Sequence, residues 1–216
     1  MSGAGPRSSP APRALVAALL ALTATTGVVD AVCFIGLGRV FTANMTGNVV
    51  LLGFGLAGTD GLPILAPLVS LAAFAGGAAV GGVLIRRHGR PRLRVALAGE
   101  ALLAGTAAIV CAATDVRAGT VVAGVVIALL ATAMGLRNAI VRKLAVAELT
   151  TTVLTMTVTG LAADGPAAAK AHVRRLLALG AMLIGALAGA LLVQHTLWVP
   201  LGLVAVTALA LTRAVD

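Results

Sequence analysis

A single acidic residue inside an apolar stretch is the most chemically distinctive feature of this sequence. Asp30 lies in the second half of the apolar stretch 14–37. An ionised carboxylate inside a membrane costs roughly 2.5–3.5 kcal/mol, so it needs a compensating interaction. Two interpretations stay open. Asp30 is a proton or cation site that faces a water-filled cavity, or it caps a short neighbouring helix or pairs with Arg39.

Small polar residues open a short apolar segment, 44–57, and are candidates to bind a solute. They are Asn44, Thr46, Gly47 and Asn48. These residue types suit the amino terminus of a helix, where unpaired N–H groups and the helix dipole favour an anion. The same groups could instead satisfy the backbone of a turn that enters the membrane and returns.

A second short segment, 149–162, carries threonines where the first carries its polar cluster. Thr151 and Thr155 are the candidate solute contacts there, and Asn138 is a candidate in the long apolar stretch that precedes it. Hydroxyl and amide groups at membrane depth either contact a solute or satisfy a re-entrant turn. Both interpretations stay open, and the ligand that these groups favour is small and polar or anionic.

The other polar residues within the apolar stretches predict structural roles. Glu100 is expected near the cytoplasmic interface, reaching the interface itself or pairing with Arg94, and Arg137 is expected to reach the same interface. Cys33 and Cys111 are expected to act as small apolar fillers. No phosphate-binding glycine loop, nucleophile elbow or metal-ligand spacing occurs, so we predict no enzyme, no cofactor and no metal.

The composition predicts a protein that lies almost entirely in a lipid bilayer. Of the 216 residues, 60% are hydrophobic and 11% are charged, whereas an ordinary globular domain has about 25% charged residues. The net charge of +9 does not predict nucleic-acid binding, because the basic residues lie between apolar runs. The bilayer is therefore the expected partner, and no nucleic acid is expected.

Segment length predicts an all-α, polytopic membrane helix bundle with six transmembrane spans. A helix needs about 17–25 apolar residues to cross the membrane, and all the long segments except the short last one have this length. Segments 44–57 and 149–162 would reach only about 21 Å, so they are expected to be re-entrant or half-helices. The six long segments are 14–37, 63–85, 95–113, 119–141, 176–194 and 197–211.

Charge predicts the orientation of these spans in the cell membrane. If the amino terminus is inside, every Lys and Arg except Arg39 and Arg117 lies on the cytoplasmic side, as the positive-inside rule requires. Both termini are then cytoplasmic. Residues 1–13 are expected to form a disordered tail, and 14–213 a single multi-pass transmembrane domain.

The two halves of the chain, about 14–113 and 119–213, resemble each other. A shift of 108 residues places Asp30 on Asn138, and each half contains three spans and one short segment. Because three is odd, the second half must insert upside down, which predicts an inverted 3+3 repeat. Glycines match under the same shift and indicate close helix packing or a homodimer. They are Gly77 and Gly81 on Gly185 and Gly189.

Two sequence pieces carry a resemblance to a known family. They are Gly27–Phe34, which includes Asp30, and Thr42–Gly53, which contains Met-Thr-Gly-Asn. The chain resembles the YoaK-like bacterial membrane family, a domain of unknown function, from about Leu15 onward. That resemblance implies six spans in the cell membrane and no established substrate. The family usually has glycine where this chain has Met156, so a close backbone approach is not expected there.

Together these features predict a small secondary transporter or permease for a small polar or anionic solute. The alternative is a non-transporting scaffold or assembly protein that binds partner helices through its glycine faces. Both agree with an inverted repeat, because fold alone does not assign function.

Overall fold

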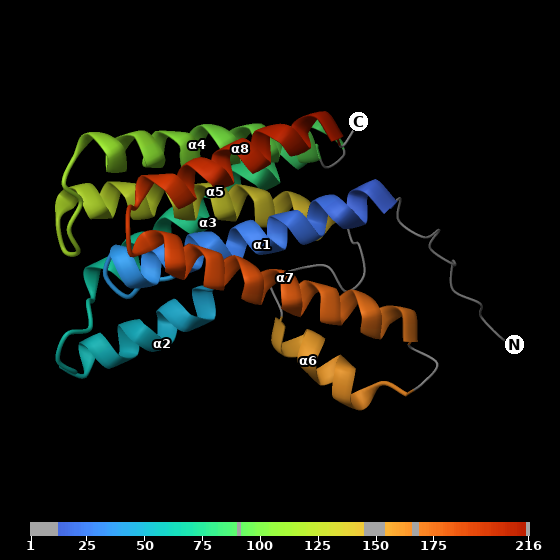
Figure 1. Ribbon diagram of the computed structural model, residues 1–216, viewed down its shortest axis with the longest axis horizontal. Helices are drawn as coiled ribbons and strands as arrows, with labels where there is room; N and C mark the ends of the chain where they lie inside the picture. The colour runs from blue at the N-terminus through green and yellow to red at the C-terminus, as the bar shows by residue number, and fades with distance from the viewer. Residues whose placement is uncertain (1–12, 90–91, 145–153, 166–168, 215–216) are drawn as a thin grey trace, which may run out of the picture.

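The computed structural model describes residues 13–89, 92–144, 154–165 and 169–214, and all regular structure in these ranges is helical (Figure 1). This confirms the predicted all-α class. The helices are α1 (Arg13–Gly36), α2 (Met45–Leu56), α3 (Leu65–His88), α4 (Leu93–Ala113), α5 (Val121–Leu144), α6 (Leu154–Ala163), α7 (Ala169–Val193) and α8 (Trp198–Ala214).

Five of these helices are long and apolar enough to cross a membrane, namely α1, α3, α4, α5 and α7. Helix α8 has 17 residues and would reach about 26 Å, slightly less than a hydrocarbon core of about 30 Å. Helices α2 and α6 have 12 and 10 residues and are much shorter. The six predicted long segments all lie on helices, but five rather than six have full spanning length.

Large apolar side chains cover the outside of the bundle, as a lipid environment requires. Leu65, Leu102, Ile109 and Leu183 are each at least 70% exposed. Helices α1 and α5 are the most enclosed of the long helices, whereas α3 and α7 lie at the periphery. The arrangement therefore places α1 and α5 at the centre.

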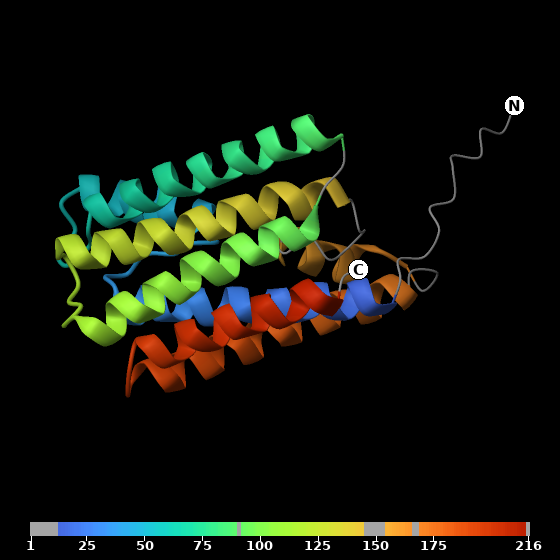
Figure 2. The same ribbon diagram turned by 90° about the horizontal axis from the view of Figure 1, so that it is seen from above.

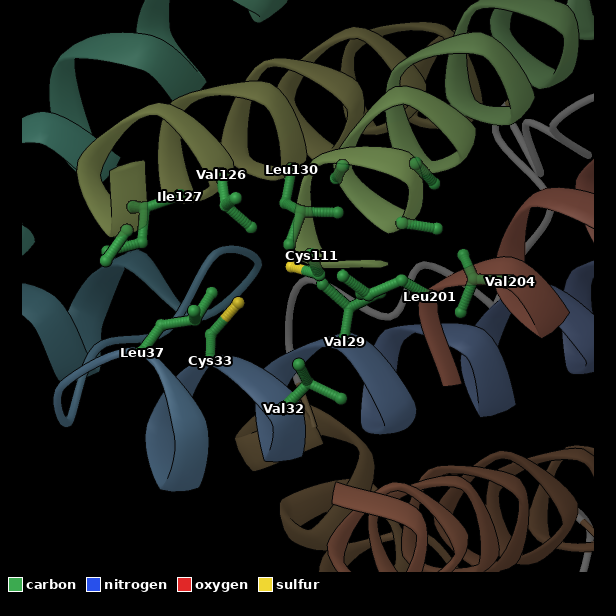
Figure 3. Close-up of a cluster of buried hydrophobic side chains, with 14 of the residues drawn as sticks. Val29, Val32, Cys33, Leu37, Cys111, Val126, Ile127, Leu130, Leu201 and Val204 are labelled. Carbon is green, nitrogen blue, oxygen red and sulfur yellow. The ribbon is translucent and has the colours of Figure 1, made fainter. Parts of the chain in front are cut away.

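The largest buried cluster joins α1, α4, α5 and α8 (Figure 3). Val29 and Cys33 of α1 face Cys111 of α4 and Leu130 of α5, and Leu201 of α8 lies beside them. Both cysteines are free and buried, so the prediction that they act as apolar fillers is confirmed. This cluster fixes α1, and through it the position of Asp30.

Glycines allow two pairs of helices to approach at backbone distance. Helix α3 packs along α5, and α1 packs along α7. A Cβ atom on Gly77 of α3 would collide with the carbonyl oxygen of Thr132 in α5, and one on Gly185 of α7 with that of Ala24 in α1. Each member of the second contact lies 108 residues from a member of the first.

The reverse contacts follow the same rule. A Cβ atom on Gly135 of α5 would collide with the Phe74 carbonyl oxygen, and one on Gly27 of α1 with the Met182 carbonyl oxygen. Helix α4 packs against α8, its counterpart in the second half (Figure 2). Figure 1 also shows that α5 runs in the opposite direction to α1. The packing therefore repeats after 108 residues with reversed helix direction.

The sequence-matched glycines all contact their own chain. Gly81 faces Leu136 and Ala139 of α5, as Gly189 faces Val28 and Ala31 of α1. Together with Gly77 and Gly185, they bury the faces that a homodimer or a partner helix would need. A dimer through these glycines is therefore excluded by the fold.

We expect Gly77→Ala to destabilise the protein by about 1–3 kcal/mol, because the new methyl group overlaps the α5 backbone. Gly76→Ala is the matched control, since nothing lies within 4 Å of a Cβ atom at Gly76. Thermal unfolding in detergent would measure both. An unfolding midpoint for Gly77→Ala equal to that of Gly76→Ala would contradict the close approach.

Candidate functional site

The amino-terminal ends of the two short helices meet at one cavity. Figure 1 shows α2 and α6 on the same side of the bundle, each with its first residues toward the middle of the molecule. The cavity has a volume of about 650 Å³. It is lined from α1, the α1–α2 loop, α2, α3, α6 and α7 by Thr26, Asp30, Phe41, Ala43, Asn44, Met45, Thr46, Gly47, Val50, Leu51, Phe74, Thr155 and Met182.

Asp30 lies in the wall of this cavity and holds the loop that leads into α2. Its Oδ1 accepts hydrogen bonds from the backbone N–H groups of Thr42 at 2.9 Å and Ala43 at 3.0 Å. Its side chain is 5% exposed. Among the described residues no hydrogen bond to Oδ2 is found. Asp30 thus has both a capping role and access to a cavity.

Pairing of Asp30 with Arg39, one of the expected alternatives, is wrong. Arg39 lines a second and mainly apolar hollow of about 1040 Å³, which lies between the first residues of α3 and α5. It forms no ion pair with Asp30. Asp30 is therefore left without a direct basic partner among the described residues.

Asn48 has a structural position and lies outside the cavity lining. The residue is fully buried. Its Oδ1 accepts the N–H of Phe41 at 2.9 Å, and its Nδ2 donates to the Phe41 carbonyl at 2.6 Å and to Ser70 Oγ at 3.1 Å. Asn48 thereby ties the α1–α2 loop to α2 and α3. A direct contact with a solute, which the sequence suggested, does not fit this geometry.

Asn44 caps α2 and leaves the start of the helix open to the cavity. Its Oδ1 accepts the Gly47 N–H at 3.1 Å, and its carbonyl accepts the Asn48 N–H at 3.2 Å. The N–H groups of Met45 and Thr46 have no intrahelical acceptor, because the first turn of a helix lacks one. Both residues line the cavity, so this helix end presents donors and a positive dipole to it.

The second half contributes less to the cavity than the first. Thr155, in the first turn of α6, lines it, and Met182 of α7 closes it on the far side. Asn138 is partly buried on α5 and lies outside the lining. Thr151 lies outside the described residues. Of the second-half candidates, only Thr155 reaches the cavity.

A buried ion pair joins α4 and α5 immediately behind the cavity. Arg137 Nη1 donates to Glu100 Oε1 at 2.7 Å, and both side chains are at most 2% exposed. The expectations that Glu100 pairs with Arg94 and that Arg137 reaches the interface are both wrong. Glu100 Oε2 is buried without a hydrogen-bond partner among the described residues.

Two threonines of α1 extend this pair to the cavity wall. The Arg137 guanidinium donates to Thr25 Oγ1 at 3.2 Å and to Thr26 Oγ1. Thr26 also lines the cavity. Sequence reasoning missed this group, although the rule that intramembrane charges pair with one another would have matched the lone Glu100 with Arg137.

The chain matches the family model DUF1275, described as protein of unknown function, over residues 18–212. It is also similar to the UPF0700 transmembrane protein YoaK of Bacillus subtilis (strain 168), with 40% identity over 67 residues. That match covers 31% of this chain and 29% of the relative. No solved structure matches.

We expect Arg137→Met to destabilise the protein by about 3–5 kcal/mol, because it leaves Glu100 as an uncompensated buried charge. The double variant Glu100→Leu/Arg137→Met should recover much of this loss, since it removes both charges. Arg117→Met, at an exposed arginine, is the control for losing a guanidinium. Thermal unfolding in detergent measures all three. A double variant no more stable than Arg137→Met would contradict the pairing.

Proposed function

Since the chain belongs to the DUF1275 family of proteins of unknown function, its activity must be inferred from the site, and we propose that it is a membrane permease for a small polar or anionic solute. The observation that carries the proposal is the cavity shared by the amino-terminal ends of α2 and α6. The chain is a multi-pass membrane protein, like the relative it resembles. A cavity at membrane depth with polar groups in its wall is typical of a solute path.

The chemistry of the cavity supports a polar or anionic solute. At α2 the N–H groups of Met45 and Thr46 are available as donors, and the hydroxyl groups of Thr26, Thr46 and Thr155 belong to lining residues. A helix amino terminus attracts negative charge, because its dipole and its free N–H groups act together. The rest of the wall is apolar, from Phe41 to Met182, so water is partly excluded and each polar contact gains strength.

The repeating packing supports an inverted repeat as the basis of transport. The close contacts of α1 with α7 recur between α5 and α3, with the helices reversed. In this proposal α8 is the sixth span, both termini are cytoplasmic, and α2 and α6 enter from opposite faces without crossing. Rocking of one half against the other would then expose the cavity to each side in turn.

The rival function, a scaffold that binds partner helices, lacks a surface of the predicted kind. Its sequence basis was the set of matched glycines, and Gly77, Gly81, Gly185 and Gly189 all face helices of their own chain. No other observation favours that function, so the permease is the better-supported proposal.

We expect Thr46→Trp to lower solute flux at least about tenfold, because an indole would fill the cavity and remove more than about 1.4 kcal/mol of binding. Proteoliposome uptake of radiolabelled chloride, nitrate, phosphate and sulfate is the measurement. Val49→Trp is the matched control, since Val49 lies on the same helix, is 58% exposed and does not line the cavity. Its flux should stay within about twofold of wild type.

Equal flux for the two tryptophan variants would show that solute does not pass through this cavity. Wild-type protein that moves none of the four anions faster than protein-free liposomes would count against an anion permease. A cleanly folded preparation, shown by size-exclusion chromatography, is needed before either result is read.

We expect a cysteine at Arg117 to react with a membrane-impermeant maleimide in intact cells, and a cysteine at Arg87 to react only after permeabilisation. The orientation with cytoplasmic termini places these two loops on opposite sides. The background is Cys33→Ala/Cys111→Ala, which removes both native thiols. Labelling of Arg87→Cys in intact cells would refute the proposed topology.

A further inference from the structure

We propose that Asp30 is the proton-coupling residue of this permease, so that one proton crosses the membrane with each anion that the cavity carries. The inference rests on the proposed function and adds the coupling ion to it. Its basis is a surplus of one buried carboxylate over the buried bases, together with the position of that carboxylate in the cavity wall.

The count of buried charges identifies Asp30 as the group without compensation. Among the described residues, the buried charged side chains are Asp30, Glu100 and Arg137. Glu100 and Arg137 neutralise each other at 2.7 Å. One carboxylate therefore remains, and an unpaired ionised carboxylate in a membrane is strongly disfavoured. A bound cation or proton is needed to balance it.

The surroundings of Asp30 favour a proton over a metal ion. Its Oδ1 is occupied by two N–H donors, from Thr42 and Ala43, and donors cannot coordinate a cation. The start of α2, with its positive dipole, lies next to the same loop. No group of three or more His, Cys, Asp or Glu residues that could hold a metal occurs within the described ranges. A proton needs only the free lone pair of Oδ2.

The ionisable groups near Asp30 leave it as the proton acceptor that faces the cavity. Arg137 on α5 is the nearby base, and its charge is shared with Glu100. Cys33, one turn further along α1, bonds to Thr42 Oγ1 and does not line the cavity. The other helices against α1 bring no ionisable side chain to this level, because α7 has none after Arg175 and α8 has only Arg213 near its end.

Asp30 is linked directly to the place where the anion would bind. The two N–H groups that it holds belong to the residues just before Asn44, the cap of α2. An anion at Met45 and Thr46 would be repelled by an ionised Asp30 and tolerated by a protonated one. Binding of the anion and protonation of Asp30 therefore favour each other, which is the requirement for symport.

The transport step balances in charge and atoms. Water on the outer side donates a proton to Oδ2 as the anion enters, and the carboxylic acid releases it to water on the inner side as the anion leaves. No covalent bond other than O–H is made or broken. For a monovalent anion the cycle carries no net charge.

Liposomes that contain pyranine, a fluorescent pH indicator, test the proposal with chloride, nitrate, phosphate and sulfate as probes. Wild-type protein should acidify the lumen when it takes up the transported anion, and an inward proton gradient should drive its accumulation. Asp30→Asn should lose that accumulation at least about tenfold yet keep anion exchange at equilibrium within about twofold, because the amide resembles the protonated acid. Asp60→Asn, at an exposed loop position, is the control and should behave like wild type.

The outcomes separate the two proposals. Wild-type uptake without any change of luminal pH would overturn proton coupling and leave the permease standing. Proton-driven accumulation by Asp30→Asn would overturn the assignment to Asp30. Absence of exchange by wild-type protein for all four anions would overturn the permease itself. Asp30→Glu, which keeps a carboxylate, should retain coupled uptake and so guards against a folding defect in the amide variant.

Discussion

The irregular backbone between α1 and α2 sets the main physical constraint on this structure. It lies among helices, where an unpaired N–H or C=O group costs several kcal/mol because water is absent. Two side chains meet this demand. Asp30 receives the N–H groups of Thr42 and Ala43, and Asn48 bonds both the N–H and the carbonyl of Phe41. Without these bonds α2 could not begin in the middle of the bundle, and the cavity would have no floor.

Sequence reasoning located the helices well, because segment length and apolar composition decide where a chain can lie in a membrane. The short segment predicted at 44–57 is α2, and the 108-residue match between Gly77 and Gly185 recurs as matched backbone contacts. The sequence also placed polar groups at the start of α2. It could not show which of them face a cavity, since Thr46 and Asn48 differ only in the direction of their side chains.

The ion pair of Glu100 and Arg137 shows why the rest could not be predicted. Depth along a helix was estimated for each residue separately, and both appeared close enough to an interface to reach it. Their partnership depends on the rotation of α4 relative to α5, which small residues at the contact determine. That rotation is a property of packing, and no spacing within either helix encodes it. Helix-by-helix reasoning about intramembrane charges is weak for this reason.

The two halves share their packing but have diverged in chemistry, and this divergence bears on mechanism. The backbone contacts of Gly27 and Gly135 are equivalent, whereas Asp30 corresponds to Asn138, which lies outside the cavity lining. Two equivalent halves would place two carboxylates around one cavity, and the repulsion between them would hinder anion binding. Loss of one carboxylate leaves a single titratable group beside two helix amino termini. The cavity then keeps its attraction for an anion and a single position for the accompanying proton.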